Sequence, residues 1–215
     1  MTKPLARVLL ADDHHAILRG VRSHIESSGR FKVVGEGNGG RDAHRLAREL
    51  KPDIAVIDYS LPEMNGLDLA TAIKRDSPNT EIVFFTIHDG DKIIASALKA
   101  GVRGYVVKMD PEEHVLAALD ALAAGRPYFS PTVSDAVLKQ FVDTKPIASV
   151  GPLTQREREI VQLIAEGCLN KEIASRLGIT VKTVETHRST AMRKLKIRTT
   201  ADVVRWAVRN NLIEP

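Results

Sequence analysis

The chain of 215 residues is 43% hydrophobic and 27% charged, with a formal net charge of +4, a composition typical of globular proteins that excludes extended disorder. No apolar run approaches the ~18 residues that a membrane-spanning helix needs. The amino-terminal segment becomes acidic at Asp12 and Asp13, too early for a secretory signal peptide, so we expect a cytoplasmic protein without membrane association.

Short apolar runs alternate with segments of helical periodicity up to about residue 124. The expected strands are "ARVLLA", "FKVVGE", "IAVID", "EIVFFT" and "GYVVK". The expected helices cover residues 14–28, 41–50, 67–76, 91–100 and 111–124. Five such pairs in succession predict an α/β domain with a five-stranded, doubly wound parallel sheet.

The alternation of apolar runs with helical segments ends after this domain. One more helix is expected over residues 133–142, and the following segment, "DTKPIASVGP", has the prolines and small residues of a linker. Only helices are expected beyond it. The sequence therefore predicts an α/β domain over residues 1–128, a helix and linker over 129–152, and a small all-α domain of four helices over 153–215.

Polar side chains stand where four of the apolar runs end. Asp12 and Asp13 follow the first run, Asp58 closes the third, Thr86 closes the fourth and Lys108 closes the fifth. The carboxyl ends of parallel strands meet at one edge of the sheet, where open α/β folds bind ligands. With the strand order 2-1-3-4-5, the first and third strands are neighbours, so the three carboxylates are expected to converge.

Three carboxylates in one crevice favour a bound cation, because like charges raise one another's pKa. An oxygen-rich site with few protein ligands suits Mg²⁺, here held by Asp12, Asp13 and Asp58. The Thr86 hydroxyl and the Lys108 ammonium group are suitable donors to the oxygens of a phosphoryl group. The sequence therefore predicts phosphoryl transfer to Asp58.

Each of these residues also has a structural interpretation. Asp12 or Asp13 could cap the helix that begins near His14, and a single lysine such as Lys108 is more often a surface charge. The combination at four strand ends, each with the residue type that phosphoryl transfer requires, favours the functional interpretation.

The motifs "LLADDH", "IDYSLPEMNG", "FFT" and "GYVVK" resemble the receiver domain of bacterial two-component response regulators, with the spacings in order over residues 5–124. The resemblance implies that a sensor histidine kinase phosphorylates Asp58. It also implies that Asp12 and Asp13 hold Mg²⁺ and that Lys108 contacts the phosphoryl group.

In the same resemblance, Thr86 reports the phosphoryl group, and Tyr105 is the aromatic residue that swings inward when Thr86 moves. Two residues depart from the common pattern. His15 stands where the family often has proline, and Tyr59 follows the phosphoacceptor where an aliphatic residue is commoner. Neither touches the acidic cluster, so phosphorylation is still expected.

A phosphohydrolase with an aspartyl-phosphate intermediate is the alternative from another class. Haloacid dehalogenase-type phosphatases usually carry a second aspartate two residues after the nucleophile for turnover, and Ser60 occupies that position here. A persistent acyl phosphate suits a signal better than a catalyst, so we expect no metabolic enzyme. Ser60 and His88 resemble the variable positions that tune phosphate loss in the receiver family.

The positive charge is concentrated in the last third of the chain. From Gly151 onward there are 12 Lys and Arg residues against 7 Asp and Glu residues. A basic segment attached to a nearly neutral body suggests contact with a polyanion, although a solvated helical surface would show the same balance. The single cysteine, Cys168, excludes an internal disulfide and is interpreted as a small apolar residue.

Capping signals divide this third into short helices. Thr154 and Glu157 form an S/T-x-x-E capping box before "REIVQLIAEG", which Gly167 ends. Asn170 is expected to cap a helix that closes at Gly178. Thr180 is then expected to cap a third helix over "VKTVETHRSTAMRKL". Short helices joined by tight turns predict a helix-turn-helix.

The third of these helices has two unlike faces. One face is apolar and carries Val184, Ala191 and Leu195. The opposite face mixes cations with short hydrogen-bonding side chains, namely Lys182, Thr186, Ser189 and Arg193. A purely structural helix would more often carry Glu and Lys pairs there, so this helix is interpreted as a reader of the DNA major groove.

The segment from Leu153 to Leu195 resembles the LuxR-type helix-turn-helix, and its pairing with a receiver domain resembles the NarL/FixJ class of regulators. The resemblance implies contacts with the DNA backbone from Lys182, Thr183 and Arg188. It implies contacts near base edges from Glu185, Thr186 and Ser189, where Glu185 could accept from a cytosine amino group. The role of His187, in packing or in DNA binding, stays open.

The last helix, near residues 200–210, matches the dimerisation helix of that family. Its apolar side consists of Val203, Val204, Ala207 and Val208. Part of that side must also cover its own domain, and Trp206 could belong to either surface. Because single helix-turn-helix units bind weakly, we expect a homodimer on double-stranded promoter DNA.

These expectations combine into a phosphorylation-activated transcriptional regulator. Phosphorylation of Asp58 would shift Thr86 and Tyr105, and the linker would let the two domains rearrange. Two other modes stay open: regulation by a partner of the unphosphorylated receiver, and constitutive DNA binding with the receiver as a dimerisation scaffold.

Overall fold

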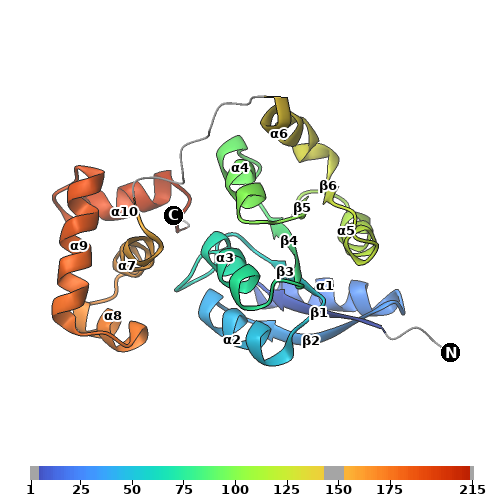
Figure 1. Cartoon of the computed structure of the whole chain (residues 1–215), viewed down its shortest axis with the longest axis horizontal. Helices are drawn as coiled ribbons and strands as arrows, with labels where there is room; N and C mark the ends of the chain where they lie inside the picture. The colour runs from blue at the N-terminus through green and yellow to red at the C-terminus, as the bar shows by residue number, and fades with distance from the viewer. Residues whose placement is uncertain (1–4, 143–152, 214–215) are drawn as a thin grey trace. The chain divides into compact units, whose positions relative to one another are not determined.

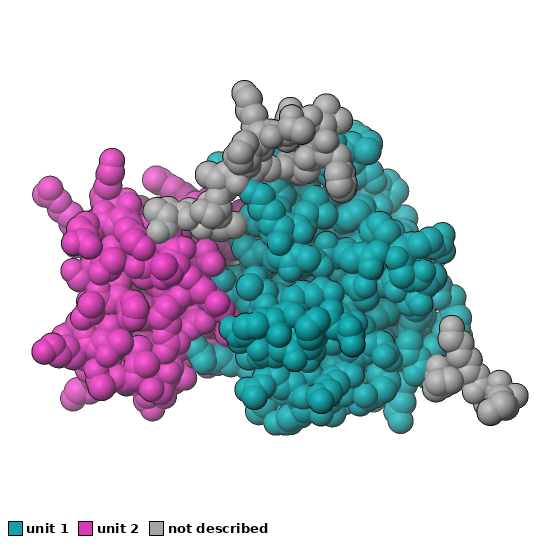
Figure 2. All heavy atoms as spheres, viewed as in Figure 1, with its two compact units in different colours: residues 1–61, 65–147 teal, residues 62–64, 148–215 magenta. Residues whose placement is uncertain are grey.

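The structure, a computed structural model, describes residues 5–142 and 153–213. The chain divides into two compact units, one of residues 1–61 and 65–147 and the other of residues 62–64 and 148–215 (Figure 2). Among the described helices, none combines the length and the apolar character needed to cross a bilayer.

The first unit is built on a parallel sheet. Its strands are β1 (Ala6–Ala11), β2 (Phe31–Gly37), β3 (Ile54–Ile57), β4 (Glu81–Thr86), β5 (Gly104–Val107) and β6 (Tyr128–Phe129). The strands lie in the order β2-β1-β3-β4-β5-β6, and every neighbouring pair is parallel. The predicted fold class and the order of the first five strands are confirmed.

The predicted number of strands was wrong by one. β6 pairs with β5 at the sheet edge, with Phe129 opposite Tyr105. The strand has only two residues within the proline- and glycine-containing segment "GRPYFSP", so it shows no alternation by which its sequence could be recognised.

Six helices complete the described part of the first unit. They are α1 (His15–Ser27), α2 (Gly40–Leu50), α3 (Gly66–Asp76), α4 (Asp91–Lys99), α5 (Glu113–Ala123) and α6 (Pro131–Val142). Helices α1 and α5 cover one face of the sheet, and α2, α3 and α4 cover the other (Figure 1). Because both faces are covered, β3 is buried along all four of its residues.

Helix α6 packs onto α4 and β5 and therefore continues the first unit beyond residue 128. Its buried residues are Val133, Ala136 and Val137. Asp110, in the loop after β5, holds the start of α6, because its carboxylate accepts a hydrogen bond from the Thr132 hydroxyl.

The second unit contains α7 (Gln155–Ala165), α8 (Asn170–Leu177), α9 (Val181–Leu195) and α10 (Thr200–Arg209). Its apolar core includes Ile160, Leu163, Ile173, Val184, Ala191, Val203 and Ala207. The predicted four-helix organisation of this unit is confirmed, including the apolar side of α9, on which Leu195 packs against the core.

The predicted caps are present at α7 and α9. The Thr154 hydroxyl accepts from the Glu157 N–H, while the Glu157 carboxylate accepts from the Thr154 N–H at 2.8 Å. The Thr180 hydroxyl accepts from the Thr183 N–H at 3.1 Å. These bonds, which are reciprocal at α7 and single at α9, satisfy amide groups that a helix leaves unpaired at its start.

The predicted cap of α8 was wrong by one residue. Leu169 is the N-cap, and the Glu172 carboxylate accepts its N–H at 2.7 Å. Asn170 is instead the first helical residue, and its side-chain oxygen accepts from Arg188 on α9. The side chain that was expected to cap the helix therefore binds Arg188, a residue that is distant in the sequence.

Candidate functional site

Asp58 lies directly after β3, the strand between β1 and β4, and is only 2% exposed. Its N–H donates to the Ala11 carbonyl oxygen at 2.8 Å, which continues the pairing of β1 with β3. The loop that follows folds back tightly, and the Gly66 N–H donates to the Tyr59 carbonyl oxygen at 2.7 Å. Gly66 thus begins α3 against the backbone of the phosphoacceptor loop.

Lys108, directly after β5, joins the buried carboxylates. Its Nζ lies 2.6 Å from Asp12 Oδ2 and 2.6 Å from Asp58 Oδ2. Burial alone would lower the pKa of Lys108, but the neighbouring charges of Asp58 and Asp12 and their hydrogen bonds raise it above its ordinary value. The ammonium group is therefore charged and compensates two buried carboxylates.

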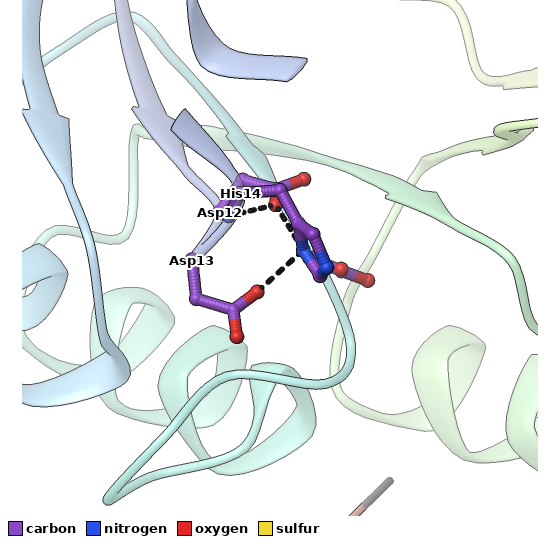
Figure 3. Close-up of side chains that lie close together, drawn as sticks. Asp12, Asp13 and His14 are labelled. Carbon is purple, nitrogen blue, oxygen red and sulfur yellow. Dashed lines mark hydrogen bonds and ion pairs between the residues drawn. The ribbon is translucent and has the colours of Figure 1, made fainter. Parts of the chain in front are cut away.

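Asp13 and His14 form the exposed part of this cluster, next to the buried Asp12 (Figure 3). His14 Nδ1 lies 2.8 Å from Asp13 Oδ1 and 3.2 Å from Asp12 Oδ1. The carboxylate of Asp13 raises the pKa of His14. Ligand atoms of these three residues and of Asp58 all lie within 4.8 Å of one another. This acidic cluster is compatible with Mg²⁺, which prefers carboxylate oxygens.

The helix-cap interpretation of Asp12 finds no support in this geometry. Asp12 Oδ1 accepts the His14 N–H at 2.9 Å, but α1 begins at His15 without a side-chain cap. The carboxylate therefore orders the turn after β1. The contact of His14 with Asp13 was missed by the sequence analysis, although the two residues are adjacent in the chain.

Thr86 and Tyr105 are linked through the backbone of His88. The Thr86 hydroxyl accepts from the His88 N–H at 3.4 Å, and the Tyr105 hydroxyl donates to the His88 carbonyl oxygen at 2.7 Å. Thr86 has no exposed surface and Tyr105 is 1% exposed, so the tyrosine ring already faces inward. Burial raises the pKa of Tyr105, whose hydroxyl therefore stays a donor.

The His88 side chain reaches back to the phosphoacceptor loop. Its Nε2 lies 2.8 Å from the Ser60 hydroxyl, and its ring meets the Tyr59 ring edge-on at 5.2 Å between centroids. Tyr59 in turn meets Phe84 edge-on at 6.2 Å. The unusual aromatic residue after Asp58 therefore packs inside the unit, between β4 and the loop that follows it.

On α9, the structure places four of the predicted DNA-binding side chains on the exposed surface, namely Lys182, Glu185, Thr186 and Ser189. Thr183, His187 and Arg188 are half-buried. The guanidinium group of Arg188 donates to Asn170 Oδ1 at 3.2 Å and to the Thr200 hydroxyl at 2.8 Å, and so bridges the starts of α8 and α10. Cys168 packs against the core of this unit.

Two of the four predicted dimerisation residues need correction. Val203 and Ala207 have no exposed surface, because they fill the core of their own unit. A side chain without exposed surface cannot add to a dimer interface. Val204 and Val208 are half-buried and keep a surface to offer, whereas Trp206 packs partly against the core.

Comparisons with known proteins agree with both units. The family described as "Response regulator receiver domain" matches residues 8–120, and the family "Bacterial regulatory proteins, luxR family" matches residues 151–207. The transcriptional regulatory protein MctR of Rhizobium johnstonii is 33% identical over 98% of this chain and 97% of its own length. The response regulator protein VraR of Staphylococcus aureus is 35% identical over 97% of this chain and 99% of its own length.

Among solved structures, RcsB of Salmonella enterica serovar Typhimurium bound to a promoter in the presence of the phosphomimetic BeF₃⁻ is 27% identical, with a TM-score of 0.61. The match covers 94% of this chain and 98% of that chain. A structure of two RcsB dimers bound to two parallel DNAs is matched over the same shares, with 27% identity and a TM-score of 0.59.

The matched families describe DNA-binding regulators and not metabolic enzymes. Their two models fall on the two units that the structure separates, in the same order along the chain. The chain therefore belongs to the two-component response regulators that join a receiver domain to a LuxR-type helix-turn-helix domain.

Proposed function

We propose that this transcriptional regulator is switched by phosphorylation of Asp58, with a sensor histidine kinase as the donor. The observation that carries the proposal is the position of Lys108, whose Nζ lies 2.6 Å from the carboxylates of both Asp12 and Asp58. Three strand ends thus bring one acceptor, one cation and a second carboxylate to a single point.

The proposed reaction is the transfer of a phosphoryl group to the Asp58 carboxylate. An Asp58 oxygen attacks the phosphorus of a phosphohistidine, a P–O bond forms, and the P–N bond breaks as the imidazole nitrogen leaves with the electron pair. Lys108 would pass from the free carboxylate to an oxygen of the bound phosphoryl group. Mg²⁺, held by Asp12, Asp13 and Asp58, would neutralise charge on the transferred group.

The Thr86 hydroxyl is the proposed sensor of the phosphoryl group. If it turns toward that group, its present acceptance of the His88 N–H is lost, and the loop after β4 is free to move. Tyr105 is bonded to the same residue, so both side chains would respond together. The phosphoryl group must favour the active state by a few kcal/mol for this population shift to matter.

The output would be promoter binding by α9. We assign Lys182, Thr183 and Arg188 to the DNA backbone, and Glu185, Thr186 and Ser189 to base edges. A solved structure of RcsB, a related protein, bound to a promoter supports promoter binding as the output. Because promoter DNA lies in the bacterial cytoplasm, the regulator would act there.

A homodimer on DNA is part of the proposal. Val204 and Val208 of α10 would supply its contacts, since they are the predicted apolar residues that keep exposed surface. Paired half-sites on DNA match a protein with two-fold symmetry, and RcsB binds DNA as dimers. For the domains we propose a receiver over residues 1–128, a helix and linker over 129–152 whose helix α6 packs on the receiver, and a DNA-binding domain over 153–215.

The test compares the full chain with its Asp58→Ala variant. DNA binding and oligomeric state are measured with Mg²⁺, with and without a small phosphodonor. Stronger binding or dimerisation with the donor in the wild type, and no response in Asp58→Ala, is the expected result. DNA binding that is the same in all four conditions would contradict the switch and favour a receiver that serves as a scaffold or as a sensor of a protein partner.

A further inference from the structure

A shallow, open hollow of about 520 Å³ lies beside α9 in the second unit. Its polar lining includes Asn170, Glu185, Arg188, Ser189, Arg193 and Arg198. Three guanidinium groups face one carboxylate there, so the hollow carries a net positive charge. A polar, positively charged depression of this kind suits an anion better than an apolar ligand.

Arg193 and Arg198 are exposed, and neither forms a side-chain ion pair with any residue that the structure describes. Three other cations of the unit are neutralised within it: Arg156 by Glu159, Lys194 by Glu157, and Arg205 by Asp202. The hollow therefore keeps two charged side chains ready for an external anion.

Arg188 adds a third guanidinium group whose position is fixed. Its bonds to Asn170 and Thr200 use two of the five N–H donors of arginine. The remaining donors are available to an anion, and the group has already lost most of its conformational freedom. A preformed arrangement lowers the entropic cost of binding.

The position of the hollow along α9 indicates its ligand. Arg193 follows Glu185 by eight residues, which is about 12 Å along a helix. The major groove is also about 12 Å wide. If the first half of α9 contacts base edges, its last turns therefore reach the rim of the groove, where the phosphates lie.

We propose that Arg193 and Arg198 bind a backbone phosphate of DNA in this hollow, with Arg188 holding the hollow in shape. The proposal rests on the proposed DNA binding and extends it to two side chains at the far end of α9 and in the turn before α10. Since a phosphate carries no base identity, these contacts strengthen binding to every sequence alike.

The test uses the full chain with Mg²⁺ and a small phosphodonor, and two labelled 30-base-pair duplexes of unrelated sequence as probes. Dissociation constants are measured against KCl concentration for the wild type, Arg193→Ala, Arg198→Ala and Arg198→Lys. Arg209→Ala is the matched control, because it removes the same charge from an exposed position at the opposite end of α10. Circular dichroism checks that each variant is folded.

We expect Arg193→Ala and Arg198→Ala each to weaken binding by about tenfold on both duplexes. Each should also lower the slope of the logarithm of the dissociation constant against the logarithm of KCl concentration by the amount expected for about one phosphate contact. Arg198→Lys should keep most of the affinity and the salt dependence, and Arg209→Ala should resemble the wild type. Alanine variants that match Arg209→Ala would overturn the phosphate site while leaving DNA binding intact. A wild type that binds neither duplex at any salt concentration would instead overturn the proposed DNA-binding function.

Discussion

A β-carbon added to Gly66 would lie 2.2 Å from the carbonyl oxygen of Asp58. Only glycine allows α3 to begin so close to the phosphoacceptor, so the Gly66→Ala variant must push the two segments apart. We expect a loss of about 2–3 kcal/mol in the free energy of unfolding, together with slower phosphorylation, because Asp58 moves relative to Lys108. Urea unfolding and uptake of phosphoryl from a small donor measure the two effects.

Gly20→Ala is the control for this substitution. Gly20 lies within α1, and its added β-carbon would meet no atom within 4 Å. Alanine is the better helix former, so this variant should gain about 0.5–1 kcal/mol and keep normal phosphorylation. Equal behaviour of the two alanine variants would show that the close approach at Gly66 is not a constraint.

The candidate site could be predicted from sequence because its residues follow apolar runs that are recognisable as strands. Asp12, Asp58, Thr86 and Lys108 each mark the end of a strand, and parallel strands bring such ends together. The strand order then placed them correctly as neighbours.

The features that sequence reasoning missed depend on contacts between distant segments. Ser60 and His88 are 28 residues apart, and no local sequence pattern indicates their hydrogen bond. The two-residue strand β6 exists only through its pairing with β5. On α10, an apolar side could serve the core or a partner equally well, and only the packing shows that Val203 and Ala207 belong to the core.

Lys108→Met tests the role of the ammonium group as a competitor of the metal ion. Its Nζ contacts Asp12 and Asp58 at 2.6 Å, so its removal takes away the ammonium group that compensates these two buried carboxylates. We expect the free energy of unfolding without metal to fall by about 2–4 kcal/mol, and Mg²⁺ to bind about tenfold more tightly. Phosphoryl uptake should fall, because the donor to the phosphoryl oxygen is gone.

Isothermal titration with MgCl₂ and thermal unfolding with and without Mg²⁺ provide the measurements for Lys108→Met. Lys92→Met, which removes an exposed charge from α4, is the control and should behave like the wild type. Unchanged Mg²⁺ affinity in Lys108→Met would mean that the ammonium group and the metal do not compete for the same carboxylates.

Tyr105→Phe removes a single buried hydrogen bond from the loop after β4. The hydroxyl lies 2.7 Å from the His88 carbonyl oxygen, and the ring is 1% exposed, so water cannot easily replace the donor. We expect the first unit to lose about 1 kcal/mol of unfolding free energy. Far-UV circular dichroism during urea unfolding measures this loss.

The second unit serves as the internal control for Tyr105→Phe. Trp206 is the only tryptophan of the chain and packs against the core of that unit, so its fluorescence reports the second unit alone. Its unfolding transition should not move. A shift of the fluorescence transition equal to the shift by circular dichroism would contradict a local role for the hydroxyl.

The ion pair of Glu157 and Lys194 predicts a pH-dependent contribution to the stability of the second unit. Lys194 Nζ lies 2.6 Å from Glu157 Oε2, and the Glu157 carboxylate is buried. Burial alone would raise the pKa of Glu157, but the hydrogen bonds from Lys194 and Thr154 lower it overall. A lowered pKa in the folded state gives stability that is complete above the unfolded value and is lost as the pH falls through the folded value.

Lys194→Met should therefore cost about 1–2 kcal/mol at pH 7, a figure reduced from that of a fully buried pair because the Lys194 side chain is 33% exposed. The difference from the wild type should shrink as the pH falls below 4.5, because Glu157 takes up a proton and no longer needs a cation. Urea unfolding, followed by Trp206 fluorescence at pH 7 and at a pH below 4.5, measures the cost of the substitution under the two conditions. Arg205→Ala, which breaks an exposed pair with Asp202, should leave the stability close to that of the wild type. A cost of Lys194→Met that is equal at both pH values would assign it to lost packing of the lysine stem and not to the charge of Glu157.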